Sequence, residues 1–211
     1  VLVLGGSGFV GRALTKRLVA QGDRVCLVNR WRSYWGSSRP VPEGSICRVK
    51  ADRNRKPVFS ERVAHVTGLV AEWDLVVDFS GFNPEDLQVA FSGIASKYKQ
   101  YLFISSDSAY EVCPSDGVPP VPGDVQPDSA GGANVVVESC SVRPADPEER
   151  KRLRKEDKYG DNKLRCEEWL QSRATDGRGI LALRLPDVIG PCDDTNRLFA
   201  YWWWCVACVV T

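Results

Sequence analysis

The first eleven residues constrain the fold more than any other stretch of the chain. Residues 1–4 form an apolar run that glycine interrupts too soon for a helix, which predicts a buried strand. Gly5, Gly8 and Gly11 follow with the spacing G-x-x-G-x-x-G, and an amphipathic helix is expected from Phe9 onward. Backbone N–H groups and the dipole at the start of such a helix favour an anion. The stretch therefore predicts a phosphate cradle for a dinucleotide.

The alternative is a glycine-rich turn that joins a strand to a helix and binds nothing. The place of the motif between a predicted strand and a predicted helix, with a second strand following, favours the dinucleotide interpretation. Glycine suits such a turn because a side chain would block the pyrophosphate or force a strained φ. The residues expected to contact the cofactor here are Gly5, Ser7, Gly8, Phe9, Val10 and Gly11.

Strands and helices are expected to alternate along the rest of the chain. The predicted strands cover residues 1–4, 25–28, 46–50, 75–79, 101–104 and 180–185. Helices are expected from Phe9 to before a turn at Gly22, at 58–70, from Asn83 to about Tyr98, and around Tyr159 to Leu170. This alternation predicts an α/β fold, a Rossmann-type doubly wound parallel sheet. The right-handed crossover rule then gives the strand order 3-2-1-4-5-6.

Composition and charge exclude several classes of function. The chain has 211 residues and a net charge of +1, which argues against general electrostatic attraction to nucleic acid or to a membrane surface. It contains no apolar run of about 18 residues, so no transmembrane helix is predicted. Residues 111–156 are rich in proline and glycine and predict a long surface insertion, within a nucleotide-binding domain expected over 1–195. Residues 146–158 are charged but nearly balanced, which is typical of a solvated helix face.

The cysteines do not form a recognisable metal site. Of the 8 cysteines, Cys205 and Cys208 make a single C-x-x-C, and His65 is the only histidine in the sequence. A structural zinc site requires four such ligands, so we expect no metal. Several cysteines stand in apolar runs as small buried side chains, which is typical of a reducing, cytoplasmic compartment.

Polar residues at the carboxyl ends of the predicted strands lie where such a sheet binds its ligand. After the second strand, Asn29 and Arg30 stand where an acidic residue would bind the ribose of NAD. Because an arginine suits a 2′-phosphate, NADP(H) is favoured as the cofactor and NAD(H) is the second choice. The alternative is that Arg30 is simply solvated. Asp52 could accept a hydrogen bond from the adenine amino group or could equally cap the following turn. Ser80 and Pro186 follow other strands and are further candidate cofactor contacts.

A second group of residues could carry proton transfer. Tyr159 and Lys163 are four residues apart on a predicted helix and therefore share one face. The ammonium of Lys163 is expected to lower the pKa of Tyr159 from about 10, so that the phenol can exchange a proton with a substrate oxygen. Ser106 would hydrogen-bond the same oxygen. A tyrosine and a lysine four residues apart also occur by chance on solvated helices. The catalytic interpretation is favoured here because a predicted nucleotide-binding fold precedes the pair.

Four motifs together resemble the extended short-chain dehydrogenase/reductase superfamily, also called the NAD-dependent epimerase/dehydratase family. They are GGSGFVG at 5–11, FISSDSAY at 103–110, YGDNK at 159–163 and LRLPDVIGP at 183–191, in the order of the family. The resemblance implies that Ser106, Tyr159 and Lys163 are catalytic. Ser106 is chosen over Ser105 because the family's serine lies four residues before the tyrosine that Tyr110 matches. Asn29-Arg30 and residues 78–82 are most similar to the branch of chloroplast stem-loop RNA-binding proteins.

The resemblance implies an NADP(H)-dependent oxidoreductase or epimerase/dehydratase-type enzyme, acting on a hydroxyl, carbonyl or nucleotide-sugar-like substrate. The alternative is a non-catalytic nucleotide-sensing or RNA-binding protein on the same fold. A homodimer through two helices is a further expectation from the family. Two features depart from its pattern: the family has a shorter gap between serine and tyrosine, and residues 196–211 would be only the start of its C-terminal substrate-binding part.

Overall fold

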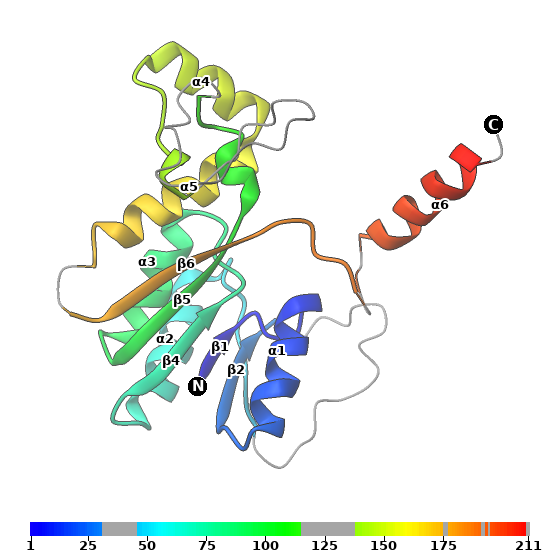
Figure 1. Ribbon diagram of the computed structural model, residues 1–211. Helices are drawn as coiled ribbons and strands as arrows, with labels where there is room; N and C mark the ends of the chain where they lie inside the picture. The colour runs from blue at the N-terminus through cyan, green and yellow to red at the C-terminus, as the bar shows by residue number, and fades with distance from the viewer. Residues whose placement is uncertain (31–45, 115–137, 175–176, 191–192, 194, 210–211) are drawn as a thin grey trace, which may run out of the picture.

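The computed structural model describes residues 1–30, 46–114, 138–174, 177–190, 193 and 195–209 (Figure 1). Its six parallel strands are β1 (Leu2–Leu4), β2 (Val25–Asn29), β3 (Ile46–Lys50), β4 (Trp73–Asp78), β5 (Tyr98–Ser106) and β6 (Gly179–Leu185). They form one sheet in the order β3-β2-β1-β4-β5-β6, and the predicted fold and strand order are confirmed.

Six α-helices lie in the described residues, and some of them cover both faces of this sheet. They are α1 (Phe9–Ala20), α2 (Lys56–Gly68), α3 (Pro84–Ile94), α4 (Pro147–Glu156), α5 (Lys158–Gln171) and α6 (Arg197–Val209), with short 3₁₀ turns η2 (Asp107–Tyr110) and η4 (Glu138–Cys140). α1 packs on one face through Leu18, against Val3, Val25 and Leu27. α2, α3 and α5 pack on the opposite face.

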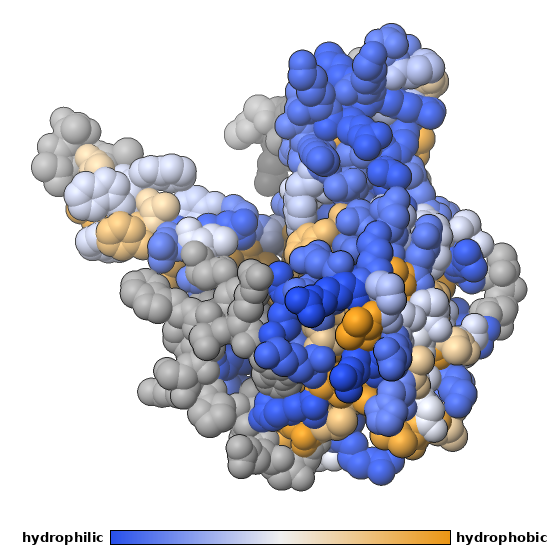
Figure 2. Space-filling view, turned by 180° about the vertical axis from the view of Figure 1, so that it is seen from behind, coloured by the Kyte–Doolittle hydropathy of each residue, from blue (hydrophilic) through white to orange (hydrophobic). Residues whose placement is uncertain are grey.

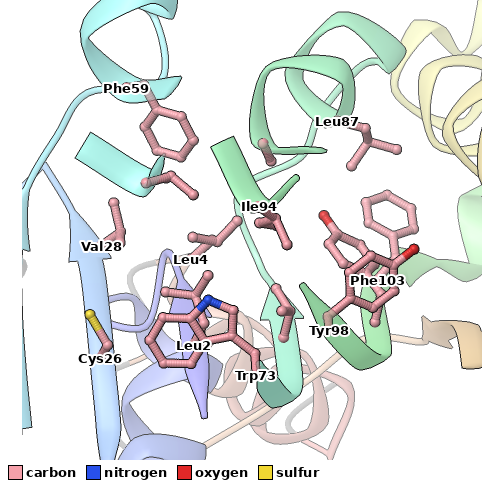
Figure 3. Close-up of a cluster of buried hydrophobic side chains, with 14 of the residues drawn as sticks. Leu2, Leu4, Cys26, Val28, Phe59, Trp73, Leu87, Ile94, Tyr98 and Phe103 are labelled. Atoms are coloured by element: carbon pink, nitrogen blue, oxygen red, sulfur yellow. The ribbon is translucent and has the colours of Figure 1, made fainter. Parts of the chain in front are cut away.

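The larger core lies under α2 and α3. In Figure 3, Phe59 from α2 and Ile94 from α3 gather over Leu2 and Leu4 of β1. Val3 points to the α1 face between these two leucines. All three residues of β1 are 0% exposed, because helices lie on both sides of the strand. The rigid centre of the sheet therefore fixes the position of the glycine turn that follows Leu4.

The predicted end of one helix is wrong, and a charged segment divides into two helices. The helix that starts at Asn83 ends at Ile94 rather than near Tyr98, because Ala95 and Ser96 adopt left-handed φ values of 49° and 63°. Tyr98 begins β5 instead. The charged segment at 146–158 is interrupted at Asp157, whose side chain accepts a hydrogen bond from the Gly160 backbone N–H and so caps a new helix, α5.

The described part of the 111–156 segment packs against the rest of the domain through buried apolar side chains. Leu153 of α4 is 9% exposed and packs with Ala109, Val112 and Leu164 in a small core of its own. The surface around α4 is hydrophilic (Figure 2). α6 extends away from the sheet in Figure 1. None of the helices in the described ranges is long and apolar enough to cross a bilayer.

Candidate functional site

A cavity of about 500 Å³ opens at the carboxyl ends of the strands. Its walls come from the β1–α1 turn, the end of β2, the segment after β3, the β4–α3 turn, β5 and the start of α5. The predicted site residues that line it are Gly5, Ser7, Gly8, Phe9, Val10, Gly11, Asn29, Arg30, Asp52, Ser80, Tyr159 and Lys163. Ser106 and Pro186 are absent from this lining. The topology thus brings together residues that are far apart in the sequence.

The glycine turn has no room for side chains at its two ends. Gly5 has a φ of +84°, which other residues rarely adopt, and a Cβ there would lie 2.9 Å from the Cβ of Ser80. A Cβ on Gly11 would lie 2.8 Å from the backbone of Gly6. The turn can therefore hold α1 close to the sheet with its N-terminus directed at the cavity, the geometry that binds a phosphate.

The β2 wall carries a buried polar side chain whose hydrogen-bonding groups are unused. Asn29 is 3% exposed, and neither its Nδ2 nor its Oδ1 has a hydrogen-bond partner among the residues described. Such a group costs free energy unless a ligand or water pairs with it. Arg30 beside it is exposed and also lines the cavity. Asp52 lines the cavity while its Oδ1 caps the turn by accepting from the Asn54 backbone N–H at 3.0 Å.

The segment after β3 adds a buried cation that sequence reasoning missed. Arg53 is 7% exposed, and its Nη1 and Nη2 each donate to Asp78 Oδ2 at 2.9 Å. Its guanidinium lies 4.8 Å from the ring centroid of Phe59. Its Nε has no partner among the described residues. In the sequence, Asp78 directly follows the apolar run Leu75-Val76-Val77, which marks a charge at the end of a buried strand, but nothing in the spacing indicates that Arg53 pairs with it.

Lys163 projects from α5 into the inner end of the cavity. It is 2% exposed, and its Nζ donates to the carbonyl oxygens of Gly81 at 2.9 Å and Ile104 at 2.8 Å. The rings of Phe103 and Phe82 lie 4.7 and 5.2 Å from Nζ. Burial lowers the pKa of this ammonium to about 8, although the carboxylate of Asp78 acts in the opposite direction.

The expected effect of Lys163 on Tyr159 is wrong for this structure. The pKa of Tyr159 is raised, chiefly by burial of the phenol, while a hydrogen bond from Ser106 acts to lower it. Burial outweighs any effect of Lys163, whose Nζ is directed to backbone carbonyls and lies 5.7 Å from the tyrosine ring centroid. Tyr159 is therefore a neutral phenol near pH 7.

The two serines at the end of β5 have different partners. Ser105 lines the cavity, but its hydroxyl donates to Glu167 Oε1 at 2.5 Å. The hydroxyl of Ser106 donates to Asp107 Oδ1 at 3.1 Å, and Ser106 acts to lower the pKa of Tyr159. The catalytic role expected of Ser106 stays a prediction.

An arginine on β6 ties the 138–141 region to the site. Arg184 pairs with Glu167 of α5, with Nη2 and Oε2 at 2.5 Å, and donates to the hydroxyls of Tyr110 and Ser141, both at 2.7 Å. Because Glu167 also accepts from Ser105, the arginine connects β6, α5, β5 and the segment after η4. The sequence contains no spacing that would have predicted these contacts. The described residues hold no group of three or more His, Cys, Asp or Glu that could bind a metal.

Residues 1–79 match the family model described as "NAD dependent epimerase/dehydratase family". A curated relative, the chloroplast stem-loop binding protein of 41 kDa b from Arabidopsis thaliana, is 29% identical over 122 residues. That alignment covers 52% of this chain and 30% of the relative. The chain thus spans under a third of the curated relative that it matches.

Solved structures share the fold along most of the chain. MoeE5 in complex with UDP-glucose and NAD is 22% identical with a TM-score of 0.59, covering 95% of this chain and 58% of that one. WbmH from Bordetella bronchiseptica in complex with NAD+ is 16% identical with a TM-score of 0.61, covering 98% and 62%. At these identities the likeness concerns the fold. Together, the comparisons confirm that the chain resembles the NAD-dependent epimerase/dehydratase family, whose model matches its N-terminal residues 1–79.

Proposed function

We propose that the cavity binds a nicotinamide adenine dinucleotide, with NADP(H) preferred, and serves an oxidoreductase or epimerase/dehydratase-type enzyme. The observation that carries this proposal is that the glycine turn, the unpaired amide of Asn29 and the pair Tyr159 and Lys163 share one cavity. The family match over residues 1–79 and the NAD named with MoeE5 and WbmH support the same cofactor class.

Different residues along the cavity would bind different parts of the cofactor and the substrate. The turn at Gly5–Gly11 would hold the pyrophosphate through backbone N–H groups, and Asn29 and Arg30 would contact the adenosine ribose. The bound nicotinamide supplies the hydride chemistry. Tyr159, a phenol at neutral pH, would give its proton to a substrate oxygen, and Ser106 would hydrogen-bond that oxygen.

Lys163 has the position to anchor the nicotinamide ribose, since its Nζ is fixed by two carbonyl groups. For the substrate, we propose a hydroxyl or carbonyl compound of the nucleotide-sugar type. The solved structures with UDP-glucose support this class by analogy of fold.

The cofactor proposal is tested by titrating the protein with NADPH and NADH and following nicotinamide fluorescence. We expect NADPH to bind more tightly, because Arg30 can pair with a 2′-phosphate. Arg30→Ala should weaken NADPH binding by about tenfold or more, which corresponds to one charged hydrogen bond, and leave NADH binding nearly unchanged. Arg17→Ala, in the last turn of α1, is the matched control. Failure to bind either nucleotide would refute the dinucleotide site; tighter NADH binding would refute only the role of Arg30.

A second candidate function is RNA binding, and the curated stem-loop binding relative is the observation that favours it. The arginines of helix α4 support this candidate less than their number suggests. Arg152 forms ion pairs with Glu149 at 3.9 Å and Glu156 at 2.9 Å, so its charge is partly neutralised within the helix. Tyr159→Phe separates the two functions. We expect the substitution to abolish turnover while nucleotide binding survives; strong, salt-dependent binding of a stem-loop RNA that is indifferent to Tyr159 would favour the second candidate.

A further inference from the structure

One buried carboxylate lies between the Arg53 end of the cavity and Lys163. Asp78, the last residue of β4, is 0% exposed. Its Oδ2 accepts hydrogen bonds from Arg53 and, at 2.7 Å, from the hydroxyl of Tyr101. Its Oδ1 accepts from the backbone N–H groups of Ser80 at 2.9 Å and Gly81 at 3.0 Å. Both oxygens are thus held, and the carboxylate can occupy only one orientation.

The turn that Asp78 holds is the turn that receives Lys163. The carbonyl oxygen of Gly81 accepts from Lys163 Nζ, and the N–H of the same residue donates to Asp78. The turn is tightly packed, since a Cβ on Gly81 would lie 2.8 Å from Leu87 and 3.1 Å from Phe103. A displacement of the carboxylate would therefore move the carbonyl that fixes the ammonium.

We propose that Asp78 is a positioning residue that links Arg53 to Lys163 through the β4–α3 turn. The carboxylate orients Gly81, and Gly81 with Ile104 aims the ammonium into the cavity. Arg53 and Tyr101 keep the carboxylate in place from the other side. The proposal deepens the proposed function and rests on it for the role of Lys163 at the nicotinamide ribose.

The charges around Lys163 decide the direction of the expected effect. The groups that face it are Asp78 from β4, Arg53 from the segment after β3, and Cys166 and Glu167 from α5. Asp78 acts more strongly than Arg53, and it favours the ammonium. Loss of the Asp78 charge should therefore lower the pKa of Lys163 further, and loss of the Gly81 contact should loosen the amine while it stays buried.

The test measures Lys163 itself in the full chain, without nucleotide. Amine acylation is followed by peptide mass spectrometry between pH 6 and 11 in wild type and Asp78→Asn. We expect the labelling midpoint of Lys163 to fall by about one pH unit and its limiting rate at high pH to rise several-fold, because the side chain is no longer held. Asp74→Asn is the matched control on the same strand; its carboxylate is exposed and pairs with Lys99, so the profile of Lys163 should not change.

A second variant guards against misfolding. Asp78→Asn leaves the Arg53 guanidinium buried without its carboxylate, which is costly. Arg53→Met with Asp78→Asn removes both charges, and the midpoint should still fall because Asp78 is the stronger influence. If the midpoint and the limiting rate of Lys163 match wild type in either folded variant, the positioning role is refuted. The labelling experiment uses no nucleotide. Its outcome therefore tests the positioning role of Asp78 separately from the NADPH titration, which tests the proposed function.

Discussion

Replacing Gly160 by alanine is expected to lower the free energy of unfolding by about 3 kcal/mol and to displace Tyr159. A Cβ on Gly160 would lie 2.1 Å from the Ser108 carbonyl oxygen and 2.4 Å from Asp157 Oδ2. The first neighbour is backbone and cannot rotate away, so α5 must separate from η2. Ala109 and Leu164 are at most 2% exposed beside this contact and would lose packing.

Urea denaturation measures the loss of stability, and the fluorescence of bound NADPH measures the state of the cavity. Gly68→Ala is the matched control, because Gly68 is the last residue of α2 and a Cβ there would have no neighbour within 4 Å. That variant should equal or exceed wild type in stability, since alanine favours helix. A Gly160→Ala protein as stable as wild type would contradict the close approach of α5 to η2.

The fold was predictable because its signals are local and repeated. Residues 1–4 and 25–28 are apolar without alternation, which is typical of strands buried on both faces. The crossover rule then fixed the strand order. The end of α3 was not predictable, because Ala95 and Ser96 take left-handed φ values where a glycine would have given a signal.

The site was predictable in part. Glycine spacing and the residues after each strand identified one rim of the cavity, since the topology alone brings those positions together. The Arg53–Asp78 pair depends on where β4 lies against β1, with Asp78 aligned to Leu4, and on the path of the chain after β3. Neither is written in local spacing. The pKa of Tyr159 was predicted in the wrong direction because an i, i+4 spacing places Lys163 on the same helix face without deciding which oxygens its flexible chain reaches.

Replacing Lys163 by methionine is expected to change how stability depends on pH. In the folded protein the pKa of this lysine is lowered to about 8, whereas an unfolded chain keeps the ordinary value of 10.5. The unfolded state therefore binds more protons between these pH values, and wild-type stability gains from this group as pH rises. The gain amounts to about 3 kcal/mol across the interval, and Lys163→Met lacks it.

The measurement is the difference in unfolding free energy between wild type and Lys163→Met at pH 7.5, 9 and 10.5. We expect this difference to shift in favour of wild type as pH rises, because only wild type has the buried lysine. Tyr101 and Cys166, whose pKa values are raised by burial, occur in both proteins, so their contributions cancel in the difference. Lys16→Met removes an exposed ammonium from α1 and should give a flat difference. A flat difference for Lys163→Met would mean that its ammonium is solvated in the folded protein, and the cavity would then lack the buried ammonium that the proposed role at the nicotinamide ribose needs.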